Sequence, residues 1–417
     1  MTAATPTAPP LSATRLGVDA ARQAIFGRIR PLDGWEEVTV HAALGRVLAT
    51  DVIAPCNVPA HDNSAMDGYA VRHADLAGQD ETCLRVVGHA FAGRPFSGIV
   101  GPGQAVRIMT GAEIPQGADT IVVQEATRSS ADQVWIPHGQ QAGQHLRRAG
   151  EDLCLGGVAV AAGKRCGPAE LGLIASLGIP SVRVRRRLRV AFFSTGDEIA
   201  SIGKPLGPGQ IYDSNRYTLH GSLRLLGCEL IDMGVIEDRP ETLEQAFLDA
   251  SRNADVIITS GGVSVGEADF IREMMSRLGE IAFWRLDIKP GRPMAFGRIG
   301  EAWVFGLPGN PVAVMVTFYQ FVKDALLTLS GVDPLPPAAR FPARCTSPIR
   351  KRPGRREFLR GIFTPSADGM TVSATGAQGS GILKSMSDAN CLIVLPEEQA
   401  DVQSGDTVMI QPFEGLF

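Results

Sequence analysis

Short runs of apolar residues alternate with longer amphipathic stretches between residues 188 and 330 of this chain. The apolar runs, rich in β-branched and aromatic side chains, are 188–194, 229–236, 255–259, 281–286 and 303–307. Between them, helical periodicity appears at 215–226, 240–252, 270–278 and 311–329. Repeated alternation of strand and helix predicts right-handed βαβ units and a largely parallel sheet that helices cover on both faces.

Sequence rich in glycine and proline flanks this α/β region on both sides. Residues 57–148 carry short β-type runs at 105–109 and 120–124, which predict a small β-rich module. The end of the chain, from about residue 336, repeats that character with runs at 371–374 and 391–395. Helical periodicity at 18–48 and 168–177 suggests two pieces that pack together across the β-rich module.

Composition and charge narrow the classes of function. The 417 residues include 44 acidic and 40 basic side chains, and the net charge of -4 argues against a protein that holds nucleic acid through phosphate attraction. Seven cysteines without a CxxC pair and seven histidines without HExxH or HxxxH spacing indicate a cytoplasmic protein without a disulfide framework or a zinc site. Residues 302–322 are uncharged, but the prolines and glycines within 306–311 break any membrane-spanning helix there.

The loops after four predicted strands carry the candidate chemistry. In an open parallel sheet, ligands bind beyond the carboxyl ends of the strands, where βα loops meet helix N-termini whose free N–H groups attract anions. The loops are Ser194-Thr195-Gly196-Asp197-Glu198, Glu237-Asp238, the segment from Ser260-Gly261-Gly262 to Asp269, and Gly306-Leu307-Pro308-Gly309-Asn310-Pro311. They combine glycines for close backbone approach with hydroxyl groups and carboxylates.

Three carboxylates, those of Glu198, Asp238 and Asp269, fall just past predicted strand ends. Any one of them is better explained as a helix N-cap, which is common at this position of the fold. Carboxylates and phosphates repel each other, so a site that collects both typically places a hard divalent cation between them, most often Mg²⁺. The three together therefore favour a metal and phosphate site.

Other polar features allow both a functional and a purely structural explanation. Asn310 followed by Pro311 has the N-cap and N1 preferences of a helix start, and a plain helix cap explains this pair about equally well. Arg285 and Lys289, with Arg292 close behind, share one side of an extended segment by the period of two, although a solvated basic edge explains them better when they are taken alone. The basic run 183–189 predicts a solvated face or an interdomain contact.

Six motifs together resemble the molybdopterin molybdenumtransferase (MoeA) family, to which the E domain of gephyrin also belongs. They are DNSAMDGYAVR at 62–72, RIMTG at 107–111, FSTGDE at 193–198, SGGVSVGEAD at 260–269, KPG at 289–291 and GLPGNPV at 306–312. The resemblance covers nearly the whole chain from about residue 16. It implies insertion of molybdate into adenylylated molybdopterin, with Mg²⁺-dependent release of AMP.

The resemblance also implies a domain organisation and partners. It implies a multidomain α/β fold with a discontinuous mixed linker and dimerisation domain (16–56 and 150–184), an inserted β-rich domain (57–149), a doubly wound α/β domain that binds molybdopterin (185–332) and a C-terminal β-barrel-like domain (336–417). A homodimer with the site at the subunit interface follows, and the pathway allows a transient contact with a molybdopterin adenylyltransferase. Neither nucleic acid nor a membrane is an expected partner.

Residue roles carry over by matching position to motif. The resemblance implies that Glu198, Asp238 and Asp269 act around Mg²⁺ and the pyrophosphate, that the glycine loops bind the pyrophosphate, and that Lys289 with Arg285 contacts anionic substrate. It further implies roles for Asp67, Thr110 and Asp152, and for Arg360 and Ser380 of the last domain, which can serve the cleft of the other subunit. Arg285 departs from the lysine expected in many relatives, and this exchange keeps the charge while changing the geometry of anion binding.

Two other classes of function remain as alternatives. One is a protein-assembly scaffold that keeps the fold and the cleft, but a scaffold would not need to retain the three carboxylates. The other is a molybdopterin adenylyltransferase, since the central α/β module is shared with that step. The motifs around Asp67 and Thr110 speak against it.

Overall fold

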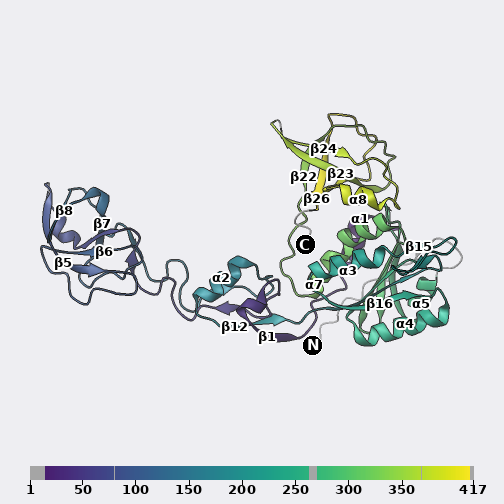
Figure 1. The fold of residues 1–417 in the computed structure, drawn as a ribbon, viewed down its shortest axis with the longest axis horizontal. Helices are drawn as coiled ribbons and strands as arrows, with labels where there is room; N and C mark the ends of the chain where they lie inside the picture. Colours follow the sequence, from purple (N-terminus) through teal and green to yellow (C-terminus); the bar gives the residue numbers. More distant parts are fainter. Residues whose placement is uncertain (1–14, 79, 263–269, 368, 414–417) are drawn as a thin grey trace, which may run out of the picture.

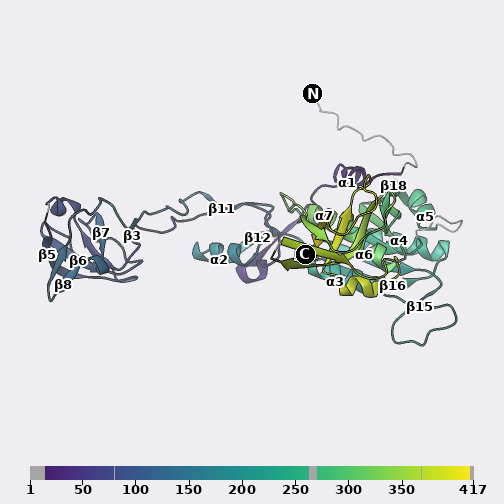
Figure 2. The same cartoon turned by 90° about the horizontal axis from the view of Figure 1, so that it is seen from above.

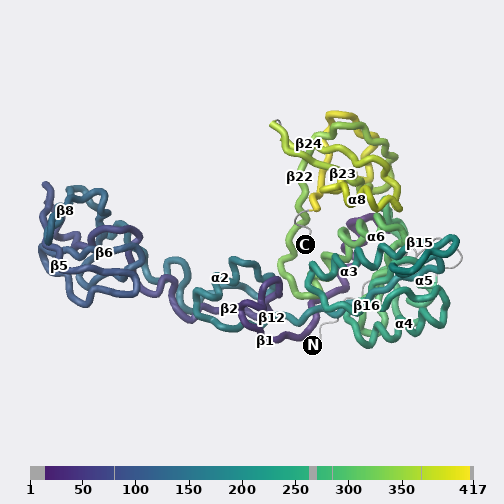
Figure 3. The backbone as a smooth tube through the Cα atoms, viewed as in Figure 1, coloured from purple at the N-terminus to yellow at the C-terminus, as the bar shows by residue number. Residues whose placement is uncertain are grey.

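The protein is elongated, with a β-rich module at one end and an α/β domain at the other (Figures 1 and 2). The computed structural model describes residues 15–78, 80–262, 270–367 and 369–413. A small unit of short strands and one helix lies between the two ends, and a C-terminal β domain lies beside the α/β domain. The chain runs out to the β-rich module and returns alongside (Figure 3), where the Val58 N–H donates to the Leu153 carbonyl at 2.7 Å.

A six-stranded sheet forms the centre of the α/β domain, with the strand order β16-β13-β17-β21-β20-β18. The strands are β16 (Glu229–Ile236), β13 (Arg189–Thr195), β17 (Val256–Ser260), β21 (Ala302–Leu307), β20 (Pro293–Ile299) and β18 (Gly279–Arg285). The first four are parallel, as the alternating pattern predicts. β20, which the pattern did not reveal, pairs antiparallel with both β21 and β18 and makes that edge of the sheet mixed.

Helices cover both faces of this sheet and divide its apolar side chains into two cores. The helices are α1 (Val18–Phe26), α3 (Asn215–Leu225) and α6 (Pro311–Thr317) on one face, and α4 (Pro240–Asn253) and α5 (Phe270–Leu278) on the other. Phe192 of β13 belongs to the first core and Phe193 to the second, because successive strand residues point to opposite faces. The doubly wound α/β fold class is confirmed.

The apolar helix Pro311–Leu329 lies inside this domain. It starts as α6, passes through a π-helical turn (Phe318–Val322) and ends as α7 (Lys323–Leu329). By length and composition it could cross a membrane, but 89% of its most apolar window is buried inside the protein. Its side chains pack into the first core, so it has the character of a core helix.

The β-rich module is a six-stranded sheet with the order β7-β4-β6-β5-β9-β8. Its strands are β7 (Thr120–Val123), β4 (Gly68–Val71), β6 (Gln104–Ile108), β5 (Thr82–Ala90), β9 (Gln133–Ile136) and β8 (Arg128–Ser130). A short pair, β3 (Asn63–Ser64) and β10 (Leu146–Arg147), lies where the chain enters and leaves. Two small cores fill the module, one on each face of the sheet.

The small unit combines two antiparallel strand pairs with short helices. It contains β1 (Trp35–Thr39) with β12 (Ser181–Arg185), β2 (Val52–Ile53) with β11 (Val158–Val160), the 3-10 turn η1 (Val40–Ala43) and α2 (Pro168–Ser176). α2 contacts η1, whereas α1 buries Val18, Ala21 and Ile25 in the α/β domain. The two helical pieces expected to pack together therefore do so only through η1, because the apolar face of α1 matches the larger core.

The C-terminal domain is a closed five-stranded barrel. Its order is β23-β24-β22-β26-β25, and pairing of β25 with β23 closes the ring. The strands are β23 (Arg356–Ser366), β24 (Gly369–Ala374), β22 (Phe341–Cys345), β26 (Thr407–Pro412) and β25 (Cys391–Leu395), with α8 (Leu383–Asp388) beside them. The two-residue strand β19 (Ile288–Lys289) leaves the α/β domain to pair with β23, so it joins the two domains directly.

We expect an Asp255→Asn variant to lose stability at neutral pH and part of its acid sensitivity. Burial alone would raise the pKa of Asp255, but hydrogen bonds from the Arg186 side chain and the Arg189 N–H outweigh it and lower that pKa. A lowered native pKa stabilises the fold above the unfolded-state pKa of ~3.9, and this contribution is lost as pH falls through the native value. Urea unfolding at pH 7 should show a loss of about 2–3 kcal/mol.

The matched control for this variant is Asp249→Asn. Asp249 pairs with Arg252 on the exposed surface of α4, and such surface pairs contribute about 0–1 kcal/mol. Equal losses in the two variants would contradict the assignment of Asp255 as a stabilising buried carboxylate.

Candidate functional site

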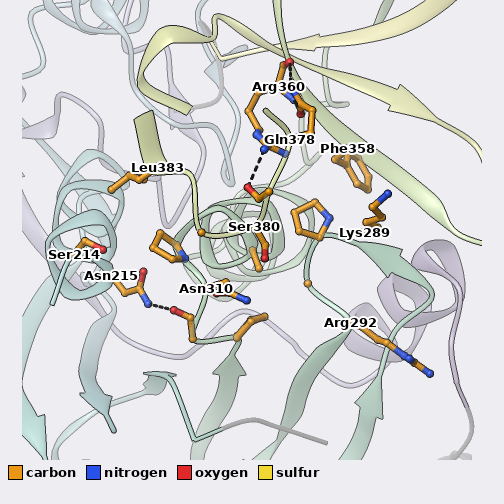
Figure 4. Close-up of a pocket in the computed structure, with 18 of the residues that line it drawn as sticks. Ser214, Asn215, Lys289, Arg292, Asn310, Phe358, Arg360, Gln378, Ser380 and Leu383 are labelled. Atoms are coloured by element: carbon orange, nitrogen blue, oxygen red, sulfur yellow. Dashed lines mark hydrogen bonds between the residues drawn. The ribbon is translucent and has the colours of Figure 1, made fainter. Parts of the chain in front are cut away.

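A cavity of about 1180 Å³ lies between the carboxyl edge of the α/β sheet and the C-terminal barrel. Parallel register brings strand ends together there, because Ser194 pairs with Ser260 and Ser260 pairs with Leu307. The residues predicted from the βα loops that line it are Ser194, Thr195, Glu198, Ser260, Gly261, Gly262, Pro308, Gly309 and Asn310. Figure 4 shows the barrel side of the cavity above this loop edge.

The glycine loop after β17 approaches β13 so closely that a side chain would not fit. Gly261 has φ +94°, and a Cβ there would lie 2.1 Å from the Thr195 carbonyl oxygen. Gly262 has φ +63°, and its Cβ would meet Ile271 and Thr195 at under 3.0 Å. Both positions therefore need glycine, and the loop presents bare backbone to the cavity. Gly196, in the loop after β13, also has a positive φ of 147° and lies under the Glu198 carboxylate.

The described carboxylates occupy one side of the loop edge. Glu198 is exposed and lines the cavity, whereas Asp238 is half-buried beside it and accepts a hydrogen bond from Thr195 Oγ1 at 3.2 Å. Burial, together with the charges of Asp197 and Glu198, raises the pKa of Asp238 above its ordinary value, although the Thr195 hydrogen bond opposes this. Asp269 lies outside the described residues. Within those residues, no group of three carboxylate, imidazole or thiol side chains is placed to hold a metal ion.

The two expected basic residues are separated by a domain boundary. Lys289 lines the cavity and its Nζ lies 3.0 Å from Glu357 Oε2 of the barrel. Arg285 ends β18 in the α/β sheet and does not line the cavity, whereas Lys289 belongs to β19, which pairs with the barrel. The period-two argument does not apply, because the chain leaves one sheet for another between these residues. Arg292 does line the cavity, and its buried Nε lacks a hydrogen-bond partner.

The barrel contributes a buried arginine to the same cavity. Arg360 is only 1% exposed, and burial lowers the pKa of its guanidinium. Its Nε donates to Ser385 Oγ at 2.9 Å and its Nη2 to the Gly379 carbonyl at 3.0 Å, and within the described residues it makes no ion pair with a carboxylate (Figure 4). Ser380 follows directly and lines the cavity. Arg360 and Ser380 thus lie in the cavity of their own chain.

The start of α6 differs from a simple helix cap. Asn310 is the N-cap residue, as its place before Pro311 predicts, but its side chain makes no capping hydrogen bond. The Val312 N–H donates to the Ser380 carbonyl at 3.0 Å, which ties the helix start to the barrel. Fewer N–H donors are therefore free to face a ligand than the cap pattern predicts.

Asn215, which the sequence analysis did not select, links two of the predicted loops. Its Nδ2 donates to Ser260 Oγ at 2.8 Å and to the Gly309 carbonyl at 2.7 Å (Figure 4), while its buried Oδ1 has no partner. The residue is 7% exposed and lines the cavity. It begins α3 after the short strand β15 (Ile211–Tyr212), outside the main sheet, so the search of βα loops passed over it. The polar triplet 213–215 before a helical pattern is the signal that was available.

Three predicted residues lie far from this cavity in the same chain. Asp67 and Thr110 are in the β-rich module, where Thr110 donates to Asp67 Oδ1 from both its N–H and its Oγ1 at 2.7 Å. These bonds, the backbone one first, lower the pKa of Asp67. Asp152 is exposed on the return connection from that module. None of the three lines the cavity, because the small unit separates the module from the α/β domain (Figure 1).

Fold and cavity define a multidomain α/β protein whose ligand site lies between a doubly wound sheet and a C-terminal barrel. Three family models match along the chain: the MoeA N-terminal region (domain I and II) over residues 16–178, the "probable molybdopterin binding domain" over 191–328 and the MoeA C-terminal region (domain IV) over 342–413. The chain belongs to the MoeA family.

Relatives match over nearly the full length. A molybdopterin molybdenumtransferase of Haemophilus influenzae is 43% identical over 403 residues, 96% of this chain and 99% of that one. One of Nostoc sp. is 36% identical over 93% of this chain and 91% of its own length. A molybdopterin biosynthesis MoeA protein structure from Pyrococcus horikoshii superposes with a TM-score of 0.78 at 31% identity, covering 96% of this chain and all of that one.

Proposed function

We propose that this protein is a molybdopterin molybdenumtransferase, which inserts molybdate into adenylylated molybdopterin and releases AMP to give molybdenum cofactor. The observation that carries the proposal is one cavity in which glycine-loop backbone, Lys289 and the buried Arg360 face a carboxylate pair. Cations and N–H donors suit the anionic parts of the substrate, and the carboxylates suit a metal ion beside them. The full-length likeness to named molybdenumtransferases supports the same conclusion.

The cavity suits a pyrophosphate and a second oxyanion. The bare backbone of Gly261 and Gly262 allows close approach of phosphate oxygens. Lys289 reaches in from β19, and Arg360 lies across from it on the barrel. Molybdate is a substrate in this reaction, and its tetrahedral oxygens need the same cationic donors before transfer. The dithiolene sulfurs that receive molybdenum belong to the pterin, so the reaction requires no cysteine of the protein.

A Mg²⁺ ion fits the carboxylate side of the cavity. The raised pKa of Asp238 reflects burial and like charges that no described cation offsets. Mg²⁺ usually binds one or two protein carboxylates together with substrate phosphates and water. Glu198 and Asp238 supply the oxygen donors, and Asp269 is the third candidate. When bound, the ion would neutralise charge on the anhydride that breaks.

Asn215 positions two loops against the substrate in this proposal. Its amide holds Ser260 and the Gly309 carbonyl together, and its unpaired Oδ1 is left to accept a hydrogen bond from an N–H or O–H group of the ligand. A buried acceptor without a partner is costly, so a ligand donor there would contribute both binding energy and orientation.

A second copy of the chain accounts for Asp67, Thr110 and Asp152. The two short hydrogen bonds between Thr110 and Asp67 hold a carboxylate in place on a surface that no part of its own chain covers with the cavity. We propose a cytoplasmic homodimer in which the β-rich module of one subunit reaches the cavity of the other. A brief contact with the adenylyltransferase that supplies the substrate belongs to the same proposal.

AMP release tests the proposed function. Purified protein is given adenylylated molybdopterin and Mg²⁺, with and without molybdate. Molybdate-dependent release of AMP, together with molybdenum on the pterin, is the expected result. Tight binding without release would overturn it in favour of a scaffold. Consumption of ATP with release of pyrophosphate would favour an adenylyltransferase.

A further inference from the structure

A second, smaller pocket lies where the small unit meets the α/β domain, and arginines dominate its lining. They are Arg46, Arg165, Arg185, Arg186 and Arg187. The ends of α3 and α7 complete the pocket. Arg46 and Arg165 come from the small unit and the other three from the connection that follows β12, so the pocket spans both parts of the protein. None of the five lines the large cavity.

The basic run 183–189 divides by role at this junction. Arg183 stacks over the Trp35 ring at 4.6 Å on the exposed β1–β12 pair. Arg186 and Arg189 both bind Asp255. Arg185 and Arg187 remain, and both of them line the pocket.

The backbone around the pocket is well ordered by hydrogen bonds. The Arg185 N–H donates to the Val47 carbonyl at 2.7 Å, and Arg46 Nη2 donates to the Arg185 carbonyl at 2.8 Å. The Cys166 N–H donates to the Arg46 carbonyl at 2.8 Å, which places Arg165 on the neighbouring segment. Three arginines therefore leave adjacent segments whose spacing is set by the main chain.

Carboxylates compensate only part of this positive charge. Glu36 pairs with Arg46 and Asp255 with Arg186. Arg165 and Arg187 have hydrogen bonds only to carbonyls, those of Gly45 and Leu225 for Arg165 and that of Gly227 for Arg187. Carbonyls at a helix end explain part of the role of these two residues, but they leave the charges unpaired.

Arg185 is the residue that helix capping does not explain. Its Nε is buried without a hydrogen-bond partner, and its side chain passes beside Gly331. Cys228 does not supply a negative charge, because burial raises the pKa of its thiol to about 12 even though Arg187 and Arg165 act to lower it. Both arginines thus lie close enough to feel the same buried group, and the thiol stays neutral.

We propose that this pocket binds a small tetrahedral oxyanion, of the phosphate or molybdate type, with Arg185 as its central donor. Unpaired guanidinium groups from several segments suit such an anion, because each offers several N–H donors in a fixed fork. A bound dianion would bridge the small unit and the α/β domain. The proposal is independent of the chemistry in the large cavity.

Thermal stability and calorimetry of the full chain test this site with inorganic phosphate and, separately, molybdate, each against chloride at equal ionic strength. We expect phosphate to raise the Tm of the wild type and Arg185→Met to weaken phosphate binding by about tenfold or more. Without the anion, Arg185→Met should fold normally, because it removes an unpaired cation from among like charges. Arg183→Met, in the same basic run, and Lys289→Met, in the large cavity, should retain phosphate binding.

The outcomes separate the sources of anion. Equal loss of phosphate and molybdate binding in Arg185→Met would identify a general oxyanion site, and loss of one alone would identify its ligand. Both results support the proposal. Phosphate binding that is absent in the wild type, unchanged in Arg185→Met, or equally weakened in Arg183→Met would overturn it. Loss only in Lys289→Met would assign the phosphate to the large cavity and overturn it as well.

Discussion

A Glu198→Gln variant should lose molybdate-dependent AMP release by roughly 10²–10³-fold, the range seen when one electrostatic contributor is removed from an active site. Glu198 lines the cavity beside the half-buried Asp238, whose raised pKa reflects the crowding of carboxylates there. The amide keeps the shape of the side chain but removes its charge, so the affinity for Mg²⁺ should fall with it. Initial rates of AMP release as a function of Mg²⁺ concentration measure both effects.

Glu237→Gln is the matched control for this substitution. Glu237 is an exposed glutamate directly after β16, the strand beside β13, and it pairs with Arg239 outside the cavity. It should keep wild-type rates and the same dependence on Mg²⁺. Wild-type activity in Glu198→Gln would show that the carboxylate side of the cavity is not where the anhydride is cleaved. Equal losses in both variants would point to the general acidity of this edge instead.

The Arg360→Lys variant should raise the KM for adenylylated molybdopterin by about tenfold to a hundredfold, the loss expected for one or two charged hydrogen bonds. Arg360 is almost fully buried, is unpaired with any described carboxylate, and already donates to Ser385 and to the Gly379 carbonyl. Lysine keeps the positive charge, but a point donor cannot make these bonds and also face a ligand as a planar fork can. Steady-state kinetics and a melting curve give the two readouts.

Arg344→Lys, on the exposed surface of β22 in the same barrel, controls for a general effect of the exchange. It should leave KM and Tm unchanged. If Arg360→Lys lowers Tm while KM stays at the wild-type value, Arg360 only orders the loop around Gly379, and its assignment to substrate binding is wrong.

Much of the fold follows from local pattern. Strands with apolar residues on both faces, such as β13 and β17, alternate with amphipathic helices such as α4, and this combination favours a doubly wound parallel sheet. Because parallel strands end at one edge, loops as far apart in sequence as those containing Ser194, Ser260 and Asn310 were expected to meet, and they line one cavity. β20 escaped the pattern, because pairing with its neighbours rather than local periodicity defines it.

By itself, the sequence determined the order of strands and helices, the glycine loops and the family, because these depend on periodicity, turn chemistry and motifs that are local in the chain. Only the tertiary structure decided that Lys289 lines the cavity and Arg285 does not, that Asn215 links two loops, and that Arg360 enters the cavity of its own chain. The reason is physical: these relations join the α/β sheet to the barrel, or a helix to distant loops, and the contacts across such boundaries have no period or spacing in the sequence.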